Sequence, residues 1–273
     1  MSPRRSRKKR YPSESELRPA GEFIAHVLSH LRRVVDVGWN LLDIDAEAHR
    51  LIREAGATSC YIDYHPGFGA YPFGKVICLS VNETVLHGRP YDRALNSGDL
   101  LSMDIAVSLG GWVADSSLSI VVGEQVPAHR QLIRDTETVM WAGIDQAVAG
   151  NTVGDIGQAV WESAHGLGYT INRQFGGHGV GRTMHEEPFV PNFGPAGSGT
   201  RLVEGMVLTV EPFLTPTTDV MQISERDGWS VESGDGSTGA HAEHTLIVTS
   251  GAPLIMTARA DDPAPRSSVG PLG

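Results

Sequence analysis

The chain has 273 residues, of which 40% are hydrophobic, and a formal net charge of −10. No apolar run reaches the roughly 18 residues that a membrane-spanning helix needs, and two cysteines are too few for a disulfide framework. Because the acidic body would repel DNA and the low cysteine content suits a reducing compartment, we expect a cytoplasmic protein that binds neither DNA nor membranes.

The two ends of the chain differ in composition from the part between them. The first ten residues hold six of the 22 basic side chains and no acid, so residues 1–12 are predicted to form a basic disordered tail that could attract nucleic acid. Residues 258–273 are rich in proline, serine and glycine and are predicted to form a second disordered tail. The intervening residues 13–257 are long enough to form one domain with a substantial core.

Two segments of the chain resemble each other at an offset of 112 residues. GWNLLDIDAEAHRLIREAG begins at position 38 and GNTVGDIGQAVWESAHGLG at position 150; both have Asp-Ile after the first glycine and a glycine eighteen places on. Each segment predicts a helix that an aspartate caps, Asp43 or Asp155. A glycine then ends each helix, Gly56 or Gly168.

Each repeat follows another predicted helix and precedes strand-like sequence. The first of these helices begins with a capping box formed by Ser13 and Glu16. Both carry apolar residues at helical spacing: Val27, Leu28, Leu31, Val34 and Val35 in the first, and Leu132, Ile133, Val139 and Ile144 in the second. The order of two helices and then strands, given twice, predicts an α+β domain whose similar halves span about 13–123 and 124–257.

A hairpin in the first half carries two aspartates inside apolar strands. The segment LLSMDIAVSLGGWVADSSLSIVV has a favoured two-residue turn at Gly110-Gly111, which places Ala106 opposite Asp115. Asp104, two residues before Ala106, therefore points to the same face as Asp115, at a spacing that suits two metal ions. The alternative is a hairpin with one solvated face, since aspartate near turns is common.

Three further polar residues lie in unusual places in the second half. His178 lies in the glycine-rich string FGGHGVG, Glu211 ends the apolar strand MVLTVEPF, and Glu243 begins the strand AEHTLIVT. A glutamate beside proline at the end of a strand needs a reason, although each residue alone could be a loop histidine or a strand-end charge. Together with the two aspartates they form a set of four carboxylates and one imidazole. Such a set would balance two divalent cations, which suits Mn²⁺, Fe²⁺ or Co²⁺, with Zn²⁺ also allowed.

These residues occur in strings that resemble type I methionine aminopeptidases. The resemblance runs from about Tyr11 to Thr257, and only 32 positions separate Glu211 from Glu243, too few for the helical insertion of type II enzymes. It implies a pita-bread fold, with a curved antiparallel sheet flanked by helices. The matching strings are SVNETVLHG, MDIAV with WVADSS, GGHGVGRTMHEEP, GMVLTVEP and AEHTLIVT.

The resemblance also implies a mechanism and the roles of the site residues. Removal of the initiator methionine from nascent chains with a small second residue would use a hydroxide that bridges the two metals, with Glu211 as proton acceptor. His87 and His185 would bind the substrate and stabilise the transition state. The implied metal ligands are Asp104, Asp115, His178, Glu211 and Glu243. The implied walls of the methionine pocket include Tyr64, Tyr71, Cys78, Met184 and Trp229.

The chain departs from the family pattern near the implied site. Val113-Ala114 replaces the frequent His-Gly before the second aspartate, His241 stands where glutamine is common, and Met184 where an aromatic is common. The 65–77 loop is also longer than usual. These changes place the substrate range in question more than the type of reaction.

Two other functions are compatible with the fold, an Xaa-Pro peptidase and a catalytically silent relative that binds a partner. The string HEEP and the short chain argue against the first, and the presence of all five ligands argues against the second. We further expect a monomer whose substrates are nascent polypeptide N-termini. Its basic tail could contact ribosomal RNA.

Overall fold

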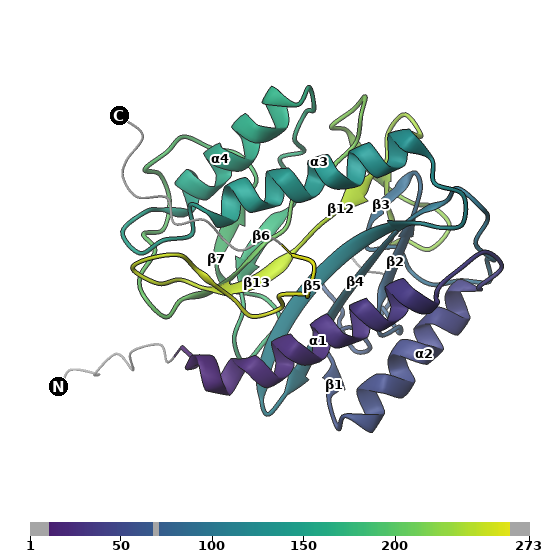
Figure 1. The fold of residues 1–273 in the computed structure, drawn as a ribbon, viewed down its shortest axis with the longest axis horizontal. Coiled ribbons are helices and arrows are strands. Elements are labelled where there is room, and N and C mark those ends of the chain that lie inside the picture. Colours follow the sequence, from purple (N-terminus) through teal and green to yellow (C-terminus); the bar gives the residue numbers. More distant parts are fainter. Residues whose placement is uncertain (1–10, 68–70, 263–273) are drawn as a thin grey trace.

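A computed structural model describes residues 11–67 and 71–262. Most of both predicted tails, residues 1–10 and 263–273, lies outside the described residues, as does part of the 65–77 loop at 68–70. Two helices followed by strands occur twice along the chain, as the sequence predicts (Figure 1). None of the helices in the described part is long and apolar enough to cross a bilayer.

Among the residues that the structure describes, the first half contains two helices and five strands. Their bounds are α1 Glu14–Val34, α2 Leu41–Glu54, β1 Thr58–Ser59, β2 Cys78–Val81, β3 Thr84–Leu86, β4 Leu100–Leu109 and β5 Trp112–Val121. The second half contains α3 Pro127–Ile144, α4 Val153–Gly166, β6 Gly176–Gly179, β7 Glu186–Pro191, β8 Val207–Val210, β9 Phe213–Leu214, β10 Met221–Ile223, β11 Val231–Ser233, β12 Ala240–His241, β13 His244–Ile247 and β14 Leu254–Ile255.

The named strands pair antiparallel, in two larger sheets and two smaller ones. In the first half β4 pairs with β5 along its length and with β1 and β2 on its other edge; the second half forms a sheet in the order β14-β13-β8-β6-β7. A bridge between Ser117 on β5 and Glu243, just before β13, brings the halves together. The Thr245 hydroxyl adds a bond, donating to the carbonyl of Asp115 at 2.7 Å. The fold is therefore the predicted α+β pita-bread arrangement of two halves that share a junction.

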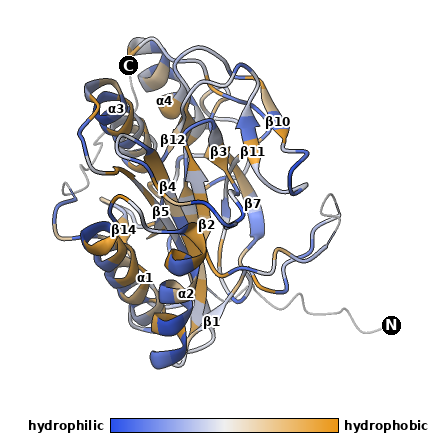
Figure 2. Cartoon of the chain, turned by 90° about the vertical axis from the view of Figure 1, so that its right-hand side faces the viewer, coloured by the Kyte–Doolittle hydropathy of each residue, from blue (hydrophilic) through white to orange (hydrophobic). Residues whose placement is uncertain are grey.

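Helices cover one side of the strands. α1 and α3 both pack against β5, and Figure 2 shows them on the same side of β4 and β5. The buried face of α1 includes Val27, Leu28 and Leu31, as the apolar spacing predicts. Two large core clusters lie in the interior, one built mainly by the first half and one mainly by the second, and residues of both halves form a smaller third cluster.

The helix ends confirm the predicted glycines but correct the predicted caps. Gly56 and Gly168 follow α2 and α4 with φ of 65° and 89°, a conformation that glycine adopts without strain. The prediction that Asp43 and Asp155 are N-caps is wrong. The caps are Asn40 and Thr152, and each aspartate lies three residues later, in the first helical turn.

Asp155 has a definite function in its helix end. Its carboxylate accepts from the backbone N–H of Thr152 at 2.6 Å and from the Thr152 hydroxyl at 2.7 Å, so it is the N3 residue of a capping box. The sequence pattern predicted both helices correctly but placed each N-cap three residues too late. Acidic residues are favoured at both positions, because both lie at the positive end of the helix dipole.

The predicted start of the C-terminal tail at residue 258 is also wrong. The guanidinium of Arg259 is buried, donates to the carbonyl of Ser117 at 3.1 Å and lies 3.0 Å from Nε2 of His244. Composition alone predicted a loose end because proline and glycine follow. The single arginine instead holds the segment against β5 and β13.

Candidate metal centre

The predicted hairpin places two carboxylates on one face of the first sheet. Ala106 pairs with Asp115 and Leu109 with Trp112, so the register predicted from the Gly110-Gly111 turn is confirmed. Asp104 lies two residues before Ala106 on β4, beside Cys78 of β2. The alternation of side chains along β4 and β5 therefore directs both carboxylates into the same space.

The second half contributes the other three residues from three neighbouring strands. His178 lies on β6, Glu211 directly follows β8, and Glu243 directly precedes β13. The backbone of β6 can approach β8 closely because a Cβ at Gly177 would lie 2.3 Å from the carbonyl oxygen of Thr209. Glycine beside His178 thus serves close strand packing, which brings the imidazole toward the hairpin.

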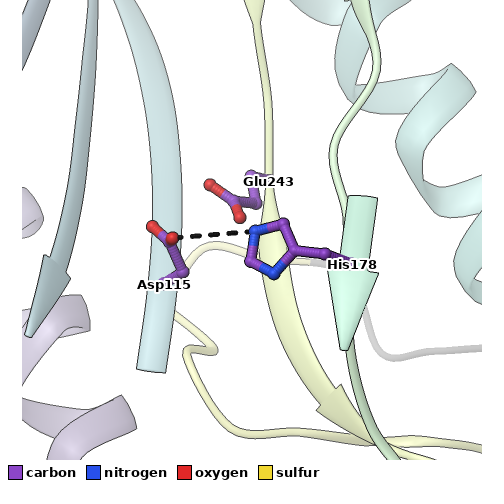
Figure 3. A group of neighbouring side chains, drawn as sticks. All are labelled: Asp115, His178 and Glu243. Carbon is purple, nitrogen blue, oxygen red and sulfur yellow. Dashed lines mark ion pairs between the residues drawn. The ribbon is translucent and has the colours of Figure 1, made fainter. Parts of the chain in front are cut away.

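The side chains of both halves converge at the junction of β5 and β13. Ligand atoms of Asp115, His178 and Glu243 all lie within 4.8 Å of one another (Figure 3). His178 Nε2 lies 4.0 Å from Asp115 Oδ2 and 3.4 Å from Glu211 Oε1. The structure therefore brings together the residues that the sequence singled out, with Asp104 beside Asp115.

The tautomer of His178 follows from its other ring nitrogen. Nδ1 lies 3.0 Å from the carbonyl oxygen of Gly179, which can only accept a hydrogen bond. Nδ1 therefore carries the proton, and the lone pair of Nε2 faces the carboxylates. Burial, and next the nearby His185, lowers the pKa of His178 to about 3, so the imidazole is neutral at pH 7. A neutral imidazole with its second nitrogen held by a carbonyl is the usual form of a metal ligand.

The carboxylates lie in surroundings that disfavour their charge. Burial raises the pKa of Asp104 to about 6 and that of Glu211 to about 8. Burial, followed by the charge of neighbouring carboxylates, also raises the pKa values of Asp115 and Glu243. Such shifts are expected where several acids share a desolvated space.

A cavity of about 700 Å³ opens over this cluster. Its lining includes all five candidate ligands, several aromatic side chains and three histidines, but no lysine or arginine among the described residues. No side chain of the described lining can therefore neutralise four carboxylates. Oxygen ligands with one imidazole and no internal cation fit divalent ions such as Mn²⁺, Fe²⁺ or Co²⁺.

The two histidines implied as substrate contacts both line the cavity. His87 has a positive φ of 52° and packs edge-on against Phe175, with ring centroids 5.7 Å apart. His185 is exposed at the cavity rim; its ring lies 4.4 Å from that of His178, and its Nδ1 lies 3.1 Å from the Tyr64 hydroxyl. Burial lowers the pKa of His87 to about 4, and partial desolvation at the rim lowers the pKa of His185, so both can act as neutral hydrogen-bond donors.

Four of the five implied pocket residues line the cavity, and one does not. Tyr64, Cys78, Met184 and Trp229 are in the lining, and Phe73, which sequence analysis did not select, packs edge-on against Trp229 at 5.3 Å. Tyr71 lies behind this wall. Its carbonyl accepts from the Trp229 indole N–H at 3.2 Å, and its hydroxyl donates to the carbonyl of Asp227.

The unusual residues beside the ligands are buried. Val113 and Ala114 belong to the first core cluster, and the Val113 N–H donates to the carbonyl of Gly181 at 2.8 Å. His241 lies on β12 with its Nε2 buried and without a protein partner. Burial, and next the charge of His87, lowers the pKa of His241 to about 3.

Sequence analysis did not select Tyr61, which contacts two of the candidate ligands. The Tyr61 hydroxyl donates to Asp104 Oδ1 at 2.6 Å and lies 3.4 Å from Asp115 Oδ1. Nothing in the string SCYIDY marks this tyrosine, because its partners lie 43 and 54 residues away. Only the edge pairing of β1 with β4 brings it there.

Comparisons with known proteins show the family of this chain. Residues 15–250 match metallopeptidase family M24. The chain is 38% identical to methionine aminopeptidase 1 of Mycobacterium tuberculosis, with 87% of this chain and 90% of that protein covered. It is 34% identical to the methionine aminopeptidase of Aquifex aeolicus, over 89% and 95% of the two chains.

Solved structures of methionine aminopeptidases resemble this chain, and those of Xaa-Pro peptidases resemble it more distantly. The methionine aminopeptidase of Rickettsia prowazekii superposes with a TM-score of 0.86 at 33% identity, over 91% of this chain and 99% of that one. An Xaa-Pro dipeptidase of Bacillus anthracis, 21% identical, superposes with a TM-score of 0.72 over 94% of this chain and 63% of that one, a likeness of fold alone. This chain therefore belongs to metallopeptidase family M24, within its methionine aminopeptidase branch.

Proposed function

We propose that this protein is a methionyl aminopeptidase that removes the N-terminal methionine from polypeptides with a small second residue. The observation that carries the proposal is a buried cluster of four carboxylates and one imidazole in a cavity whose described lining has no lysine or arginine. The names of the similar proteins support the choice of substrate. Two divalent cations would be held by Asp104, Asp115, His178, Glu211 and Glu243.

Bound divalent ions would supply Lewis acidity to the peptide carbonyl and a water that is nucleophilic at neutral pH. Glu211, whose carboxyl group would be held in its charged form by bound divalent ions, is the proposed proton acceptor for the attacking water. Its Oε1 accepts a hydrogen bond from the Thr209 hydroxyl at 2.8 Å. The oxygen of that hydroxyl accepts in turn from the backbone N–H of His178 at 2.9 Å. These contacts hold the carboxylate beside His178 and support a fixed position during proton transfer.

His87 and His185 are proposed to bind and stabilise the reacting peptide. Both reach the cavity, and both are neutral at pH 7, so each can donate a ring N–H to a carbonyl oxygen or oxyanion. A well-aimed donor of this kind contributes about 3–4 kcal/mol to transition-state stabilisation. The Tyr64 hydroxyl, 3.1 Å from Nδ1 of His185, would set which ring nitrogen of His185 faces the peptide.

The proposed methionine pocket combines soft and flat side chains. Met184 and Cys78 present sulfur, and Trp229, Phe73 and Tyr64 present aromatic rings, all within the cavity lining. A flexible thioether makes favourable contacts with both kinds of surface. The pocket therefore suits an unbranched side chain such as methionine.

The test is metal reconstitution with matched peptides. The protein is stripped with chelator, Mn²⁺, Fe²⁺, Co²⁺ or Zn²⁺ is added back singly, and the release of the first residue from Met-Ala-Ser is measured. We expect release of methionine with at least one ion and none in chelator. An Xaa-Pro peptide is assayed in parallel, because the fold is shared with an Xaa-Pro dipeptidase.

Each alternative gives a different result in this assay. Hydrolysis of the Xaa-Pro peptide in preference to Met-Ala-Ser would replace the proposed substrate. Failure to cleave either peptide with any ion, in a protein that is folded by circular dichroism, would contradict the catalytic proposal and favour a binding function.

A further inference from the structure

Tyr61 lies between two acids of the candidate metal centre and the aromatic wall of the cavity. Its ring is buried and meets Phe73 edge-on, with centroids 5.8 Å apart and planes at 77°. Its hydroxyl reaches Asp104 and Asp115, and its N–H donates to the Ser59 hydroxyl at 3.1 Å. The ring is thus fixed on one side by packing and the hydroxyl on the other by the carboxylates.

The hydroxyl has one proton, and the distances show where it goes. At 2.6 Å from Asp104 Oδ1 the contact has the short length of a charge-assisted hydrogen bond, whereas Asp115 Oδ1 at 3.4 Å is a weaker second neighbour. Both contacts use Oδ1 atoms. Asp115 turns its Oδ2 toward His178 Nε2, at 4.0 Å. Tyr61 and His178 therefore approach Asp115 from its two different oxygens.

We propose that Tyr61 is a positioning residue for the metal ligands Asp104 and Asp115. Its hydroxyl donates to Asp104 Oδ1 and lies beside Asp115 Oδ1, which leaves Asp115 Oδ2 directed toward His178 of the second half. The inference rests on the proposed function, because it gives Tyr61 a role only if this cluster binds divalent ions. Partners that orient a ligand in this way affect metal affinity without binding the metal themselves.

A purely structural role for Tyr61 predicts a different outcome from the positioning role. If the ring matters only for packing against Phe73, phenylalanine at position 61 should preserve every property of the site. The chain contains a matched pair outside the centre, where the Tyr169 hydroxyl donates to Asp135 Oδ2 at 2.9 Å. Removal of either hydroxyl costs one partly buried tyrosine–aspartate hydrogen bond, but only Tyr61 touches candidate ligands.

The experiment compares Tyr61→Phe and Tyr169→Phe with the unaltered protein after removal of metal. Binding of Mn²⁺ is measured by titration calorimetry, and Co²⁺ is followed by its visible absorption, neither of which requires turnover. We expect Tyr61→Phe to bind Mn²⁺ about 10- to 100-fold more weakly and to alter the Co²⁺ spectrum, with Tyr169→Phe within twofold of the unaltered protein. For Met-Ala-Ser, Tyr61→Phe should recover activity in excess Mn²⁺ with an unchanged KM.

The outcomes separate this inference from the function on which it rests. If the unaltered protein binds no divalent ion, the proposed metal centre itself fails. If it binds Mn²⁺ and Tyr61→Phe binds equally well with the same Co²⁺ spectrum, only the role of Tyr61 is overturned. Equal losses in Tyr61→Phe and Tyr169→Phe would also overturn it, because they would indicate a general effect on stability.

Discussion

Two buried polar clusters lie back to back on the strands that join the halves of the molecule. Side chains alternate along a strand, so Asp115 and Glu243 face the cavity while their neighbours Ser116 and His244 face the other side. There, Arg259 contacts both of these neighbours: its guanidinium lies 3.3 Å from Ser116 Oγ and 3.0 Å from His244 Nε2. One junction thus carries two polar clusters that differ in charge.

Both clusters contain buried carboxyl groups, but among the described residues only one of them contains a cation of the protein. Burial tends to raise the pKa of any carboxyl group, and it does so for the acids that face the cavity. For Asp262, on the other side, contacts with His244 and Arg259 outweigh burial and hold the pKa at about 2. The protein supplies its own cation where the cluster only joins segments. No lysine or arginine of the described residues lines the cavity, as expected of a surface that binds an external ion.

Replacing a cavity acid should have the largest effect, and that effect should be on turnover. Glu211→Gln keeps the size of the side chain but removes the proposed proton acceptor, so we expect kcat for Met-Ala-Ser to fall about 10²- to 10⁴-fold at saturating Mn²⁺. Bound metal is quantified alongside. Asp261→Asn, at an exposed acid beside the other cluster, serves as the control and should retain full activity. Retention of more than a tenth of the activity by Glu211→Gln would contradict the proposed role.

The sequence predicted the cavity cluster better than the cluster behind it, for a physical reason. The hairpin register follows from a local turn and a side-chain period of two, so Asp104 and Asp115 could be placed on one face. Tyr61 and Arg259 depend on contacts with partners 43 and 142 residues away. No local pattern encodes such pairings. The composition around Arg259 even favoured a disordered tail.

Removing the internal cation should be the largest change to stability. Arg259→Met removes a buried guanidinium and leaves the carboxylate of Asp262 with His244 as its remaining partner, so we expect the free energy of unfolding to fall by about 3 kcal/mol. Urea unfolding in chelator measures this. Arg32→Met removes the exposed ion pair with Asp261 and should cost less than about 1 kcal/mol. Similar losses in the free energy of unfolding for both variants would contradict a larger contribution of Arg259 to stability.

Adding an external cation should stabilise only through the cavity cluster. At an Mn²⁺ concentration about 100-fold above Kd, binding to the folded state adds about 2.7 kcal/mol to the free energy of unfolding. We expect this gain in the unaltered protein and its loss in Glu243→Gln, measured by urea unfolding with and without Mn²⁺. The exposed substitution Glu54→Gln is the control and should keep the gain. A gain that persists in Glu243→Gln would place the stabilising ion elsewhere.

The smallest expected effect is the pH dependence contributed by Asp262. Its pKa in the folded protein is about 2, below the ordinary value of 3.8, so its contribution is fully present above about pH 4 and is lost as pH falls toward 2. Asp262→Asn should therefore cost about 2 kcal/mol at pH 7, and the difference from the unaltered protein should shrink between pH 4 and pH 2. Urea unfolding in chelator across this range measures the difference, with Asp261→Asn as the neighbouring control. A difference that stays constant with pH would mean that Asp262 acts through packing rather than charge. The two clusters would then differ less in their electrostatics than their pKa shifts indicate.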